Sequence, residues 1–318
     1  MISQQKYLPS VSIIVPIYNG ETDLHQLIKC LFKQTYPKEL SEYLLVDNNS
    51  SDRTAIILKE AQQTASEKGM KLRHLSEKEI QSSYAARNLG IRKAQGEILV
   101  FTDTDCRPQP DWLEKIVQPF SNFQVGIVVG EVVALFGNTL LEKYADRNQI
   151  MSQKFLLQHP FYPYGQTANI AIRKEAFVKV GLFRPHLTTG GDADICWRIQ
   201  KETSWQLAYA PTAIIEHRHR SNLKNFRSQF RRYGSSNRYL HELHGVNLMR
   251  ELTPQEIFYR LSRWLLKELP TNSLKAIAGK TPWIDLLKTP IDLIGFQART
   301  QGQQESKLPE AARKIEWL

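Results

Sequence analysis

The sequence predicts an α/β protein in which a mostly parallel sheet is flanked by helices and followed by a helical C-terminal extension. Continuous apolar runs at 11–17 and 98–101 have the pattern of strands that are covered on both faces. Helical patterns alternate with such runs, which is typical of parallel βαβ units with right-handed crossovers. From Ser221 onward the chain has helical patterns and no strand pattern. We therefore expect one domain over 1–220 and the extension over 221–318.

Each element follows from local patterns that turn residues separate. In the first part, strands are predicted at 11–17, 43–46, 71–75 and 98–101, and helices over 24–32, from about 53, over 82–94 and over 112–120. In the second part, we expect an apolar segment at 125–135, helices over 140–157 and 195–201, and short strands at 170–172, 207–210 and 213–215.

The composition is that of an ordinary globular protein, with 42% hydrophobic and 23% charged residues among 318. No apolar run approaches the ~18 residues of a membrane-spanning helix. Residues 1–9 are polar and lack the apolar core of a signal peptide. The three cysteines are far apart, which argues against a disulfide framework and favours a reducing, cytoplasmic location.

The formal net charge of +10 is unevenly placed, since 17 Lys and Arg stand against 9 Asp and Glu from Arg220 onward. A basic region can serve nucleic acid, an anionic membrane surface or a phosphorylated substrate. No nucleic-acid-binding motif accompanies it, so we expect no nucleic-acid partner. The amphipathic segments 256–269 and 283–296, the second interrupted by Pro290, are either a helical cap on the main domain or helices at the inner face of a membrane.

Polar side chains follow three of the predicted strands. Tyr18 follows the first strand, Asp47 the second, and Asp103 and Asp105 the fourth. In parallel α/β sheets, ligands bind at the carboxyl ends of the strands. Two carboxylates just past a strand end can converge on one hard divalent cation, although the pattern also fits a plain polar turn.

A second acidic cluster, Thr188 to Asp194, precedes the helix predicted at 195–201. Its carboxylates either serve the chemistry or cap the helix. His217 follows a strand end, where its imidazole is available to a metal or a diphosphate unless it is an ordinary surface or core residue. Gln166 and Asn169, in a loop rich in aromatic residues, are candidates for substrate contacts.

Five motifs occur in a fixed order: Val15-Pro-Ile-Tyr-Asn19, Val46-Asp-Asn-Asn-Ser-Ser-Asp52, Ala86-Arg-Asn-Leu-Gly90, Asp103-Thr-Asp105 and Gly191-Asp-Ala-Asp-Ile-Cys-Trp-Arg198. Over roughly residues 9–220 the chain resembles the family-2 glycosyltransferases, a large inverting family with the Rossmann-like GT-A fold. The resemblance implies sugar transfer from a nucleoside diphosphate sugar to a hydroxyl group, with Mn²⁺ or Mg²⁺ as cofactor. It also implies a lipid-linked saccharide or a growing surface polysaccharide of the cell envelope as acceptor.

The resemblance implies roles for the residues on the donor side. Pro16 and Tyr18 would belong to the substrate-binding motif, with Tyr18 against the nucleotide base. Asp47 would accept hydrogen bonds from the base or the ribose. Arg87 would lie near the nucleotide or the diphosphate. Asp103 would contact the ribose and the metal shell.

Further roles concern the metal and the acceptor. By resemblance, Asp105 would be a direct metal ligand, His217 a further candidate, and Asp192 the general base. The family commonly has Glu before that Asp, whereas this chain has Gly191, so hydrogen bonding on the acceptor side must differ. We expect Asp194 to orient the acceptor or to have a structural role.

Two other classes remain open at this point. A sugar-nucleotide nucleotidyltransferase would need a Gly-rich basic loop after the first strand, and residues 18–22 contain one Gly and no Lys or Arg. A dinucleotide-dependent oxidoreductase would need GxGxxG there, which is absent. A non-catalytic, transferase-like partner subunit in polysaccharide assembly is the second open alternative, and complete loss of a carboxylate site would favour it.

Overall fold

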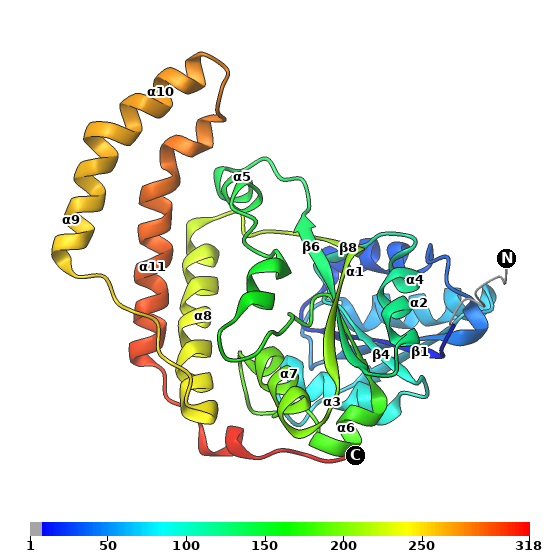
Figure 1. Ribbon diagram of the computed structural model, residues 1–318. Coiled ribbons are helices and arrows are strands. Elements are labelled where there is room, and N and C mark those ends of the chain that lie inside the picture. Colours follow the sequence, from blue (N-terminus) through cyan, green and yellow to red (C-terminus); the bar gives the residue numbers. More distant parts are fainter. Residues whose placement is uncertain (1–7) are drawn as a thin grey trace, which may run out of the picture. The chain divides into compact units, whose positions relative to one another are not determined.

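A computed structural model describes residues 8–318, so the expectation for the first nine residues falls mostly outside the described part of the chain (Figure 1). The chain forms two compact units. The first contains the residues up to Val133, Met151–His217 and Pro309–Leu318, and the second contains Ala134–Ile150 and Arg218–Leu308. The division into a domain over 1–220 and an extension over 221–318 stays a prediction.

The first unit is built on an eight-stranded sheet in the order β3-β2-β1-β4-β7-β6-β8-β5. Four neighbouring strands are parallel, namely β3 (Lys71–Ser76), β2 (Ser41–Asp47), β1 (Val11–Ile17) and β4 (Ile98–Phe101). Every residue of β1, β2 and β4 is buried, because helices cover both faces of the sheet, as the continuous apolar runs predict. The predicted α/β class is confirmed.

The other half of the sheet is antiparallel, which the sequence patterns do not indicate. It contains β7 (Ile170–Arg173), β6 (Val125–Ala134), β8 (Gln206–His217) and β5 (Cys106–Pro108). The two short strands predicted at 207–210 and 213–215 form the single strand β8, which continues through Pro211. This half matters for the site because β5 directly follows the turn after the parallel strand β4, and β8 pairs with β5.

Helices of the first unit are α1 (Glu21–Leu31), α2 (Thr54–Glu67), α3 (Ser83–Lys93), α4 (Trp112–Val117), α6 (Lys174–Val180) and α7 (Gly191–Glu202). Helix α7 begins four residues before the predicted start at 195, because Gly190 adopts a left-handed conformation and the chain becomes helical directly after it. Asp192 and Asp194 therefore lie in the first turn of a helix rather than in the loop before it.

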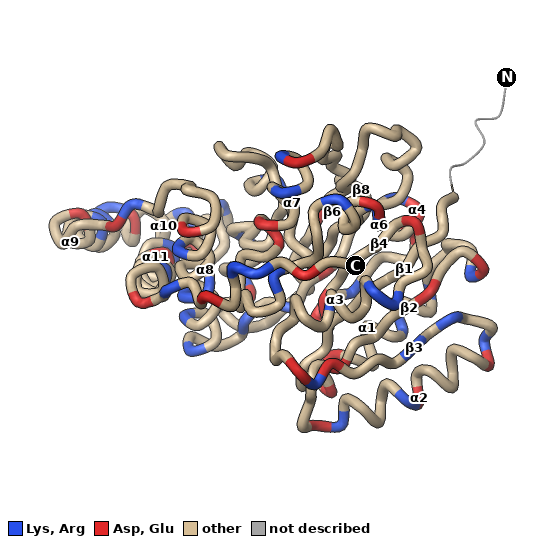
Figure 2. Tube along the Cα trace, turned by 90° about the horizontal axis from the view of Figure 1, so that it is seen from below, with Lys and Arg blue, Asp and Glu red and all other residues tan. Residues whose placement is uncertain are grey.

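The second unit is helical. It contains α5 (Leu140–Arg147), α8 (Leu223–His244), α9 (Pro254–Arg263), a π-helical turn (Trp264–Glu268), α10 (Leu269–Ile277) and α11 (Lys288–Glu305). The helix predicted over 140–157 ends at Arg147, since Gln149 has a positive φ, and a 3₁₀ turn follows in the first unit at Gln153–Gln158. Figure 2 shows Lys and Arg along α8, whose basic residues are Lys224, Arg227, Arg231, Arg232 and Arg238. Over residues 8–318, we find no helix that has both the length and the apolar character needed to span a membrane.

Candidate active site

The carboxyl ends of three parallel strands share one edge of the sheet. Ile17, at the end of β1, is in register with Asp47, at the end of β2. The N–H of Asn48 donates to the carbonyl of Ile17 at 2.7 Å, and β4 pairs with the other side of β1. Tyr18, Asp47 and the Asp103–Asp105 turn are thus brought to the same edge, as predicted from their positions after strands.

Two loops at this edge hold each other in place. Asn19 and Asn49 have positive φ values of 47° and 59°, a conformation that Asn tolerates better than most residues. The N–H of Asn19 donates to Ser50 Oγ at 2.9 Å, and its Oδ1 accepts from the N–H of Ser51 at 2.9 Å. These bonds fix the backbone on which Tyr18 lies.

Tyr18 and Asp47 differ in their exposure to solvent. The side chain of Tyr18 is 57% exposed, so its ring is available for stacking. Asp47 is buried, and its Oδ1 accepts a hydrogen bond from the N–H of Ser50 at 3.0 Å. Pro16 contributes its carbonyl oxygen, which accepts from Thr104 Oγ1 at 3.2 Å and ties the end of β1 to the Asp103–Asp105 turn.

Arg87, on α3, brings a buried positive charge to the acidic turn. It is 3% exposed, and its Nη2 lies 2.6 Å from Asp103 Oδ1. Its guanidinium carbon lies 5.5 Å from the centre of the Tyr84 ring. Its Nε is buried and has no hydrogen-bond partner among the described residues. The predicted nearness of Arg87 to the acidic turn is present in the structure.

Asp105 and His217 meet through the antiparallel part of the sheet. Cys106 on β5 is in register with His217 at the end of β8. The Nε2 of His217 consequently lies 3.4 Å from Asp105 Oδ1. This pairing joins residues more than a hundred positions apart, which no local sequence pattern reveals.

The residues at this turn fit a divalent cation by their chemistry. Carboxylate oxygens suit Mg²⁺ and Mn²⁺, and an imidazole nitrogen is a further ligand for Mn²⁺. Within residues 8–318, no group of three or more His, Cys, Asp or Glu side chains is arranged to hold a metal ion. Asp105 and His217 form a pair, so oxygen atoms of a bound anion would have to complete the coordination.

Asp192 lies in the first turn of α7 and is partly buried. Its Oδ1 accepts a hydrogen bond from Thr167 Oγ1 at 2.9 Å. Burial raises the pKa of Asp192, the charge of Arg87 opposes this rise, and the charge of Asp103 adds to it. A carboxylate with a raised pKa is a stronger base than an exposed one, which suits it to accept a proton.

Two residues predicted to contact the substrate, Asp194 and Asn169, bind other groups of the protein. Asp194 is fully buried between the guanidinium groups of Arg184 and Arg198, each with a nitrogen at 3.1 Å. Asn169 is also fully buried: its Oδ1 accepts from Trp112 Nε1, and its Nδ2 donates to two backbone carbonyls. Both side chains therefore stabilise the fold, and of the two roles expected for Asp194 the geometry supports the structural one.

Sequence reasoning missed two residues of the site, Thr167 and Tyr84. Thr167 lies in the loop at 162–169, in which the sequence points only to Gln166 and Asn169. The backbone of this loop is held by Gln153, whose Oε1 accepts from the N–H of Gln166 at 2.6 Å. Tyr84 precedes the Ala86-Arg-Asn motif by two positions. The one signal that could have identified it is its place on the same helix as Arg87.

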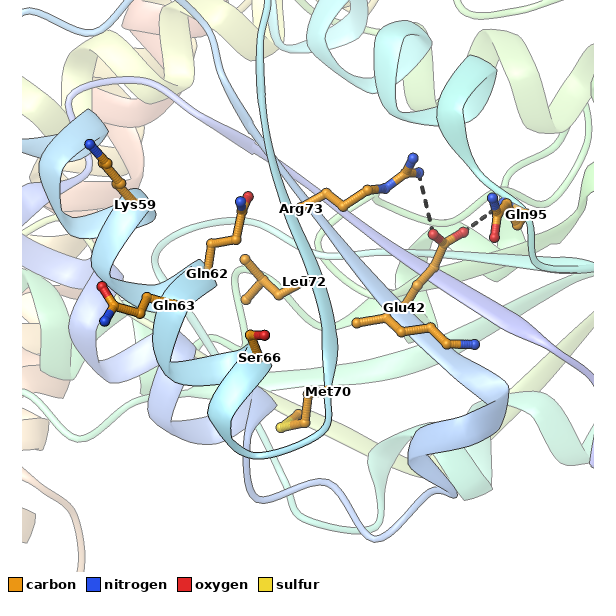
Figure 3. A pocket seen from close by; sticks show the side chains of 10 residues that line it. Glu42, Lys59, Gln62, Gln63, Ser66, Met70, Leu72, Arg73 and Gln95 are labelled. Atoms are coloured by element: carbon orange, nitrogen blue, oxygen red, sulfur yellow. Dashed lines mark hydrogen bonds and ion pairs between the residues drawn. The ribbon is translucent and has the colours of Figure 1, made fainter.

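A separate groove of about 640 Å³ lies between α2, β3 and the start of β2. Figure 3 shows Arg73 reaching Glu42 across it, at 3.3 Å. Glu42 and Lys71 stand near the amino ends of their strands, whereas the residues described above stand beyond the carboxyl ends. The groove is therefore not part of the candidate active site.

Comparisons with known proteins identify the family of the chain. The chain matches the family described as Glycosyl transferase family 2 over residues 12–181, and Glycosyl transferase family group 2 over residues 98–291. It is 34% identical to glycosyltransferase AglE of Haloferax volcanii over 226 residues, which are 70% of this chain and 72% of that protein. It is 30% identical to a pre-mycofactocin glycosyltransferase of Mycobacterium tuberculosis over 48% of this chain and 33% of that protein.

Solved structures show the same fold. A mannosyltransferase from Pyrobaculum calidifontis, in complex with GDP-Man and Mn²⁺, has a TM-score of 0.66 at 18% identity, over 94% of this chain and 88% of that chain. TarS of S. aureus, in complex with UDP, has a TM-score of 0.51 at 15% identity, over 92% and 90% of the two chains. With the site geometry and the family match, these findings show that the chain belongs to glycosyltransferase family 2 and has the GT-A fold.

Proposed function

We propose that this glycosyltransferase is inverting and metal-dependent, and that it transfers a sugar from a nucleoside diphosphate sugar to a hydroxyl group of a lipid-linked or polysaccharide acceptor. The observation that carries the proposal is the arrangement around Arg87. This buried cation contacts Asp103 of the acidic turn and acts electrostatically on Asp192, the candidate base. Because the carboxylates of the site are present, a catalytic protein is favoured over a non-catalytic partner subunit.

The donor would bind along the shared edge of the parallel strands. The exposed ring of Tyr18 offers a stacking surface for a base, and Asp47 offers a buried carboxylate oxygen to the base or the ribose. The positive charge of Arg87, beside Asp103, would attract the diphosphate of the donor. Neighbours of the same fold were solved with GDP-Man and with UDP, which supports a nucleotide in this place.

Asp105 and His217 would hold the divalent cation, and Asp103, which pairs with Arg87, would stand beside it. The candidate site contains the carboxylates of Asp47, Asp103, Asp105 and Asp192, which would otherwise repel a diphosphate. A bound Mn²⁺ or Mg²⁺ would neutralise the charge of the leaving diphosphate. The neighbour from Pyrobaculum calidifontis was solved with Mn²⁺, which supports this cofactor.

Asp192 would act as the general base of a single displacement. It would accept the proton of the acceptor hydroxyl as that oxygen attacks the anomeric carbon, and the bond to the diphosphate would break on the opposite side. Such a displacement inverts the anomeric configuration. Thr167 would hold the carboxylate in the orientation for this transfer through the hydrogen bond at 2.9 Å.

The acceptor class is proposed from a relative and from the second unit. A relative from Methanococcus voltae, 24% identical over 71% of this chain and 72% of that protein, is named as a transferase acting on a dolichyl sugar phosphate. In the second unit, residues 254–277, which we call the arm, have one buried residue, Ala276. Such a lipid-linked acceptor would place the enzyme at a membrane, and we propose the cytoplasmic face.

The arm has the chemistry of a surface that meets an anionic membrane. Leu266, Leu274 and Ile277 are 77%, 71% and 73% exposed. The stretch from Pro254 to Lys280 contains five Lys and Arg and two Glu, and no Asp. The other amphipathic segment, 283–296, instead contributes Ile284, Ile291 and Ile294 to the apolar core of the second unit. The arm rather than this second segment is the part that would bind lipid.

Replacing Asp105 by Ala should weaken binding of a nucleoside diphosphate and remove its dependence on Mn²⁺, because a carboxylate ligand of the cation is lost. The measurement is titration calorimetry with Mn²⁺ and with a chelator. Asp111→Ala, at a side chain that is 48% exposed and pairs with Lys115, is the matched control and should bind like the wild type. Equal affinity of the wild type with metal and with chelator would refute the metal assignment.

Asp192→Asn should lower kcat by about 10²–10⁴, the usual contribution of a general base, with donor affinity and melting temperature near those of the wild type. Asp194→Asn should instead lower stability by about 3–5 kcal/mol, because two buried guanidinium groups lose their counter-charge. Steady-state kinetics, calorimetry and thermal unfolding distinguish the two. High turnover of Asp192→Asn, or a product that retains the donor's anomeric configuration by NMR, would contradict the mechanism.

Thr167→Val should shift the acid limb of the pH–rate profile to higher pH. The hydrogen bond from Thr167 lowers the pKa of Asp192, so its loss raises that pKa further. The active form is deprotonated, and its population at a given pH falls when the pKa rises. The measurement is kcat/KM between about pH 4 and 8, the range over which a raised carboxyl pKa is detected. An unchanged acid limb would show that Asp192 does not control it.

Replacing Leu266, Leu274 and Ile277 together by Ser should reduce binding to anionic vesicles by at least about tenfold, since burial of one such side chain is worth about 1.5–3 kcal/mol. Wild-type binding should weaken as salt increases. Ser at Ile56, Phe123 and Val178, three exposed apolar side chains of the first unit, is the matched control. Equal binding of the wild type to phosphatidylserine-containing and pure phosphatidylcholine vesicles, or binding to neither, would contradict the proposal.

A further inference from the structure

Tyr84, near the start of α3, touches both halves of the proposed active site. Its hydroxyl accepts a hydrogen bond from the N–H of Gly191 at 2.9 Å, at the first residue of α7. The guanidinium of Arg87 lies over its ring, with 5.5 Å from the carbon atom to the ring centre. The ring also stacks on Phe183, with 5.6 Å between ring centres and 21° between planes. One side chain thus contacts the helix of the base and the arginine beside Asp103.

The ring of Tyr84 fills the space in which a side chain at position 191 would lie. A Cβ atom built on Gly191 would be 2.7 Å from two ring carbons of Tyr84, closer than real Cβ contacts. The ring is fully enclosed by Phe183 and its other neighbours, so it cannot easily give way. While the ring of Tyr84 occupies this place, position 191 therefore has room for glycine but not for a side chain.

The starts of α3 and α7 are tied together at a second point. Ser82 Oγ accepts from the N–H of Tyr84 at 3.2 Å as the cap of α3, and it donates to the carbonyl of Leu187 at 3.1 Å in the loop before α7. The hydroxyl of Tyr84 adds a bond directly at the first turn of α7, one residue from Asp192. Small shifts of this turn would move the carboxylate of Asp192.

We propose that Tyr84 is a positioning residue for the transfer reaction. Its hydroxyl holds the first turn of α7 so that Asp192 meets the acceptor hydroxyl, and its ring supports Arg87 against Asp103. This proposal rests on the proposed function. In this chain Tyr84 takes the place of the Glu that the resembled family commonly has before the base. The ring of Tyr84 fills the space that a side chain at position 191 would need.

The two links can be removed separately. Tyr84→Phe keeps the ring and deletes the bond to Gly191, so kcat should fall by about tenfold while the KM for the donor stays unchanged, because misplaced reacting groups cost up to ~10²-fold in rate. Tyr84→Leu also removes the ring beneath Arg87, so the KM for the donor should rise as well. Tyr43→Phe is the matched control: Tyr43 is equally buried, and its hydroxyl donates to the carbonyl of Leu31 at 3.2 Å.

Thermal unfolding of the same variants separates positioning from packing. Tyr84→Phe and Tyr43→Phe should lower the melting temperature by similar amounts, because each removes the side-chain partner of one buried backbone group. The value of kcat should fall for Tyr84→Phe alone. A kcat for Tyr84→Phe within about twofold of the wild type, a change of less than ~0.5 kcal/mol in activation free energy, would overturn the positioning role. An equal loss of kcat in Tyr43→Phe would overturn it too.

A double-mutant cycle tests the steric pairing without any substrate. Gly191→Ala should lower the melting temperature more in the wild type than in Tyr84→Ala, because the ring that clashes is then gone. Additive effects would overturn the pairing. A wild-type protein that neither transfers sugar nor hydrolyses any nucleotide sugar would contradict the proposed function and the positioning role with it, whereas an active wild type with an unaffected Tyr84→Phe contradicts the positioning role alone.

Discussion

The ion pair between Arg87 and Asp103 is the interaction on which the geometry of the site depends. A guanidinium that is 3% exposed is costly to bury unless it is paired and hydrogen-bonded. Asp103 supplies the counter-charge at 2.6 Å, and the face of Tyr84 supplies a further favourable contact. The same positive charge opposes the rise that burial causes in the pKa of Asp192. One buried cation therefore links the acidic turn after β4 with the carboxylate at the start of α7.

Two aspartates in one helical turn have different roles because their surroundings differ. Asp194 is enclosed by Arg184 and Arg198, which satisfy its oxygens and leave it no access to solvent. Asp192 is partly exposed and has a neutral hydroxyl, that of Thr167, as its side-chain partner. The first is suited to fix the start of α7, and the second is suited to exchange a proton. This is the separation by environment that acid–base sites use.

The parts of the fold that could be predicted are those with local signals. The parallel strands have continuous apolar runs, and the residues after them were correctly expected at one edge of the sheet. The antiparallel half could not be predicted, since its pairings join distant segments, as β5 and β8 do. The sequence does not reveal that His217 lies near Asp105, because the two residues are also far apart in the chain.

Side-chain roles in the site were predictable only in part, for a related reason. Asn169 and Asp194 resemble substrate contacts in the sequence because a polar residue near a motif looks the same whether it meets a ligand or the core. In the structure, Asn169 bonds to Trp112 and Asp194 to Arg184, and the sequence does not reveal these partners because they lie elsewhere in the chain. Tyr84 was missed for the opposite reason, because an aromatic residue on a helix usually indicates packing.

The charge of the protein and the charge of its site have opposite signs, and this contrast bears on how a donor would bind. The chain has a formal net charge of +10, which favours the approach of a polyanionic nucleotide sugar over long distances. At contact distance, however, the donor would meet the four carboxylates and one arginine of the candidate site. The attraction over long range is screened beyond roughly 8–10 Å at physiological salt, so it cannot offset this local repulsion. A divalent cation beside Asp105 would reduce the formal charge of these groups from −3 (four carboxylates and one arginine) to −1, which is why we expect donor binding to be coupled to metal binding.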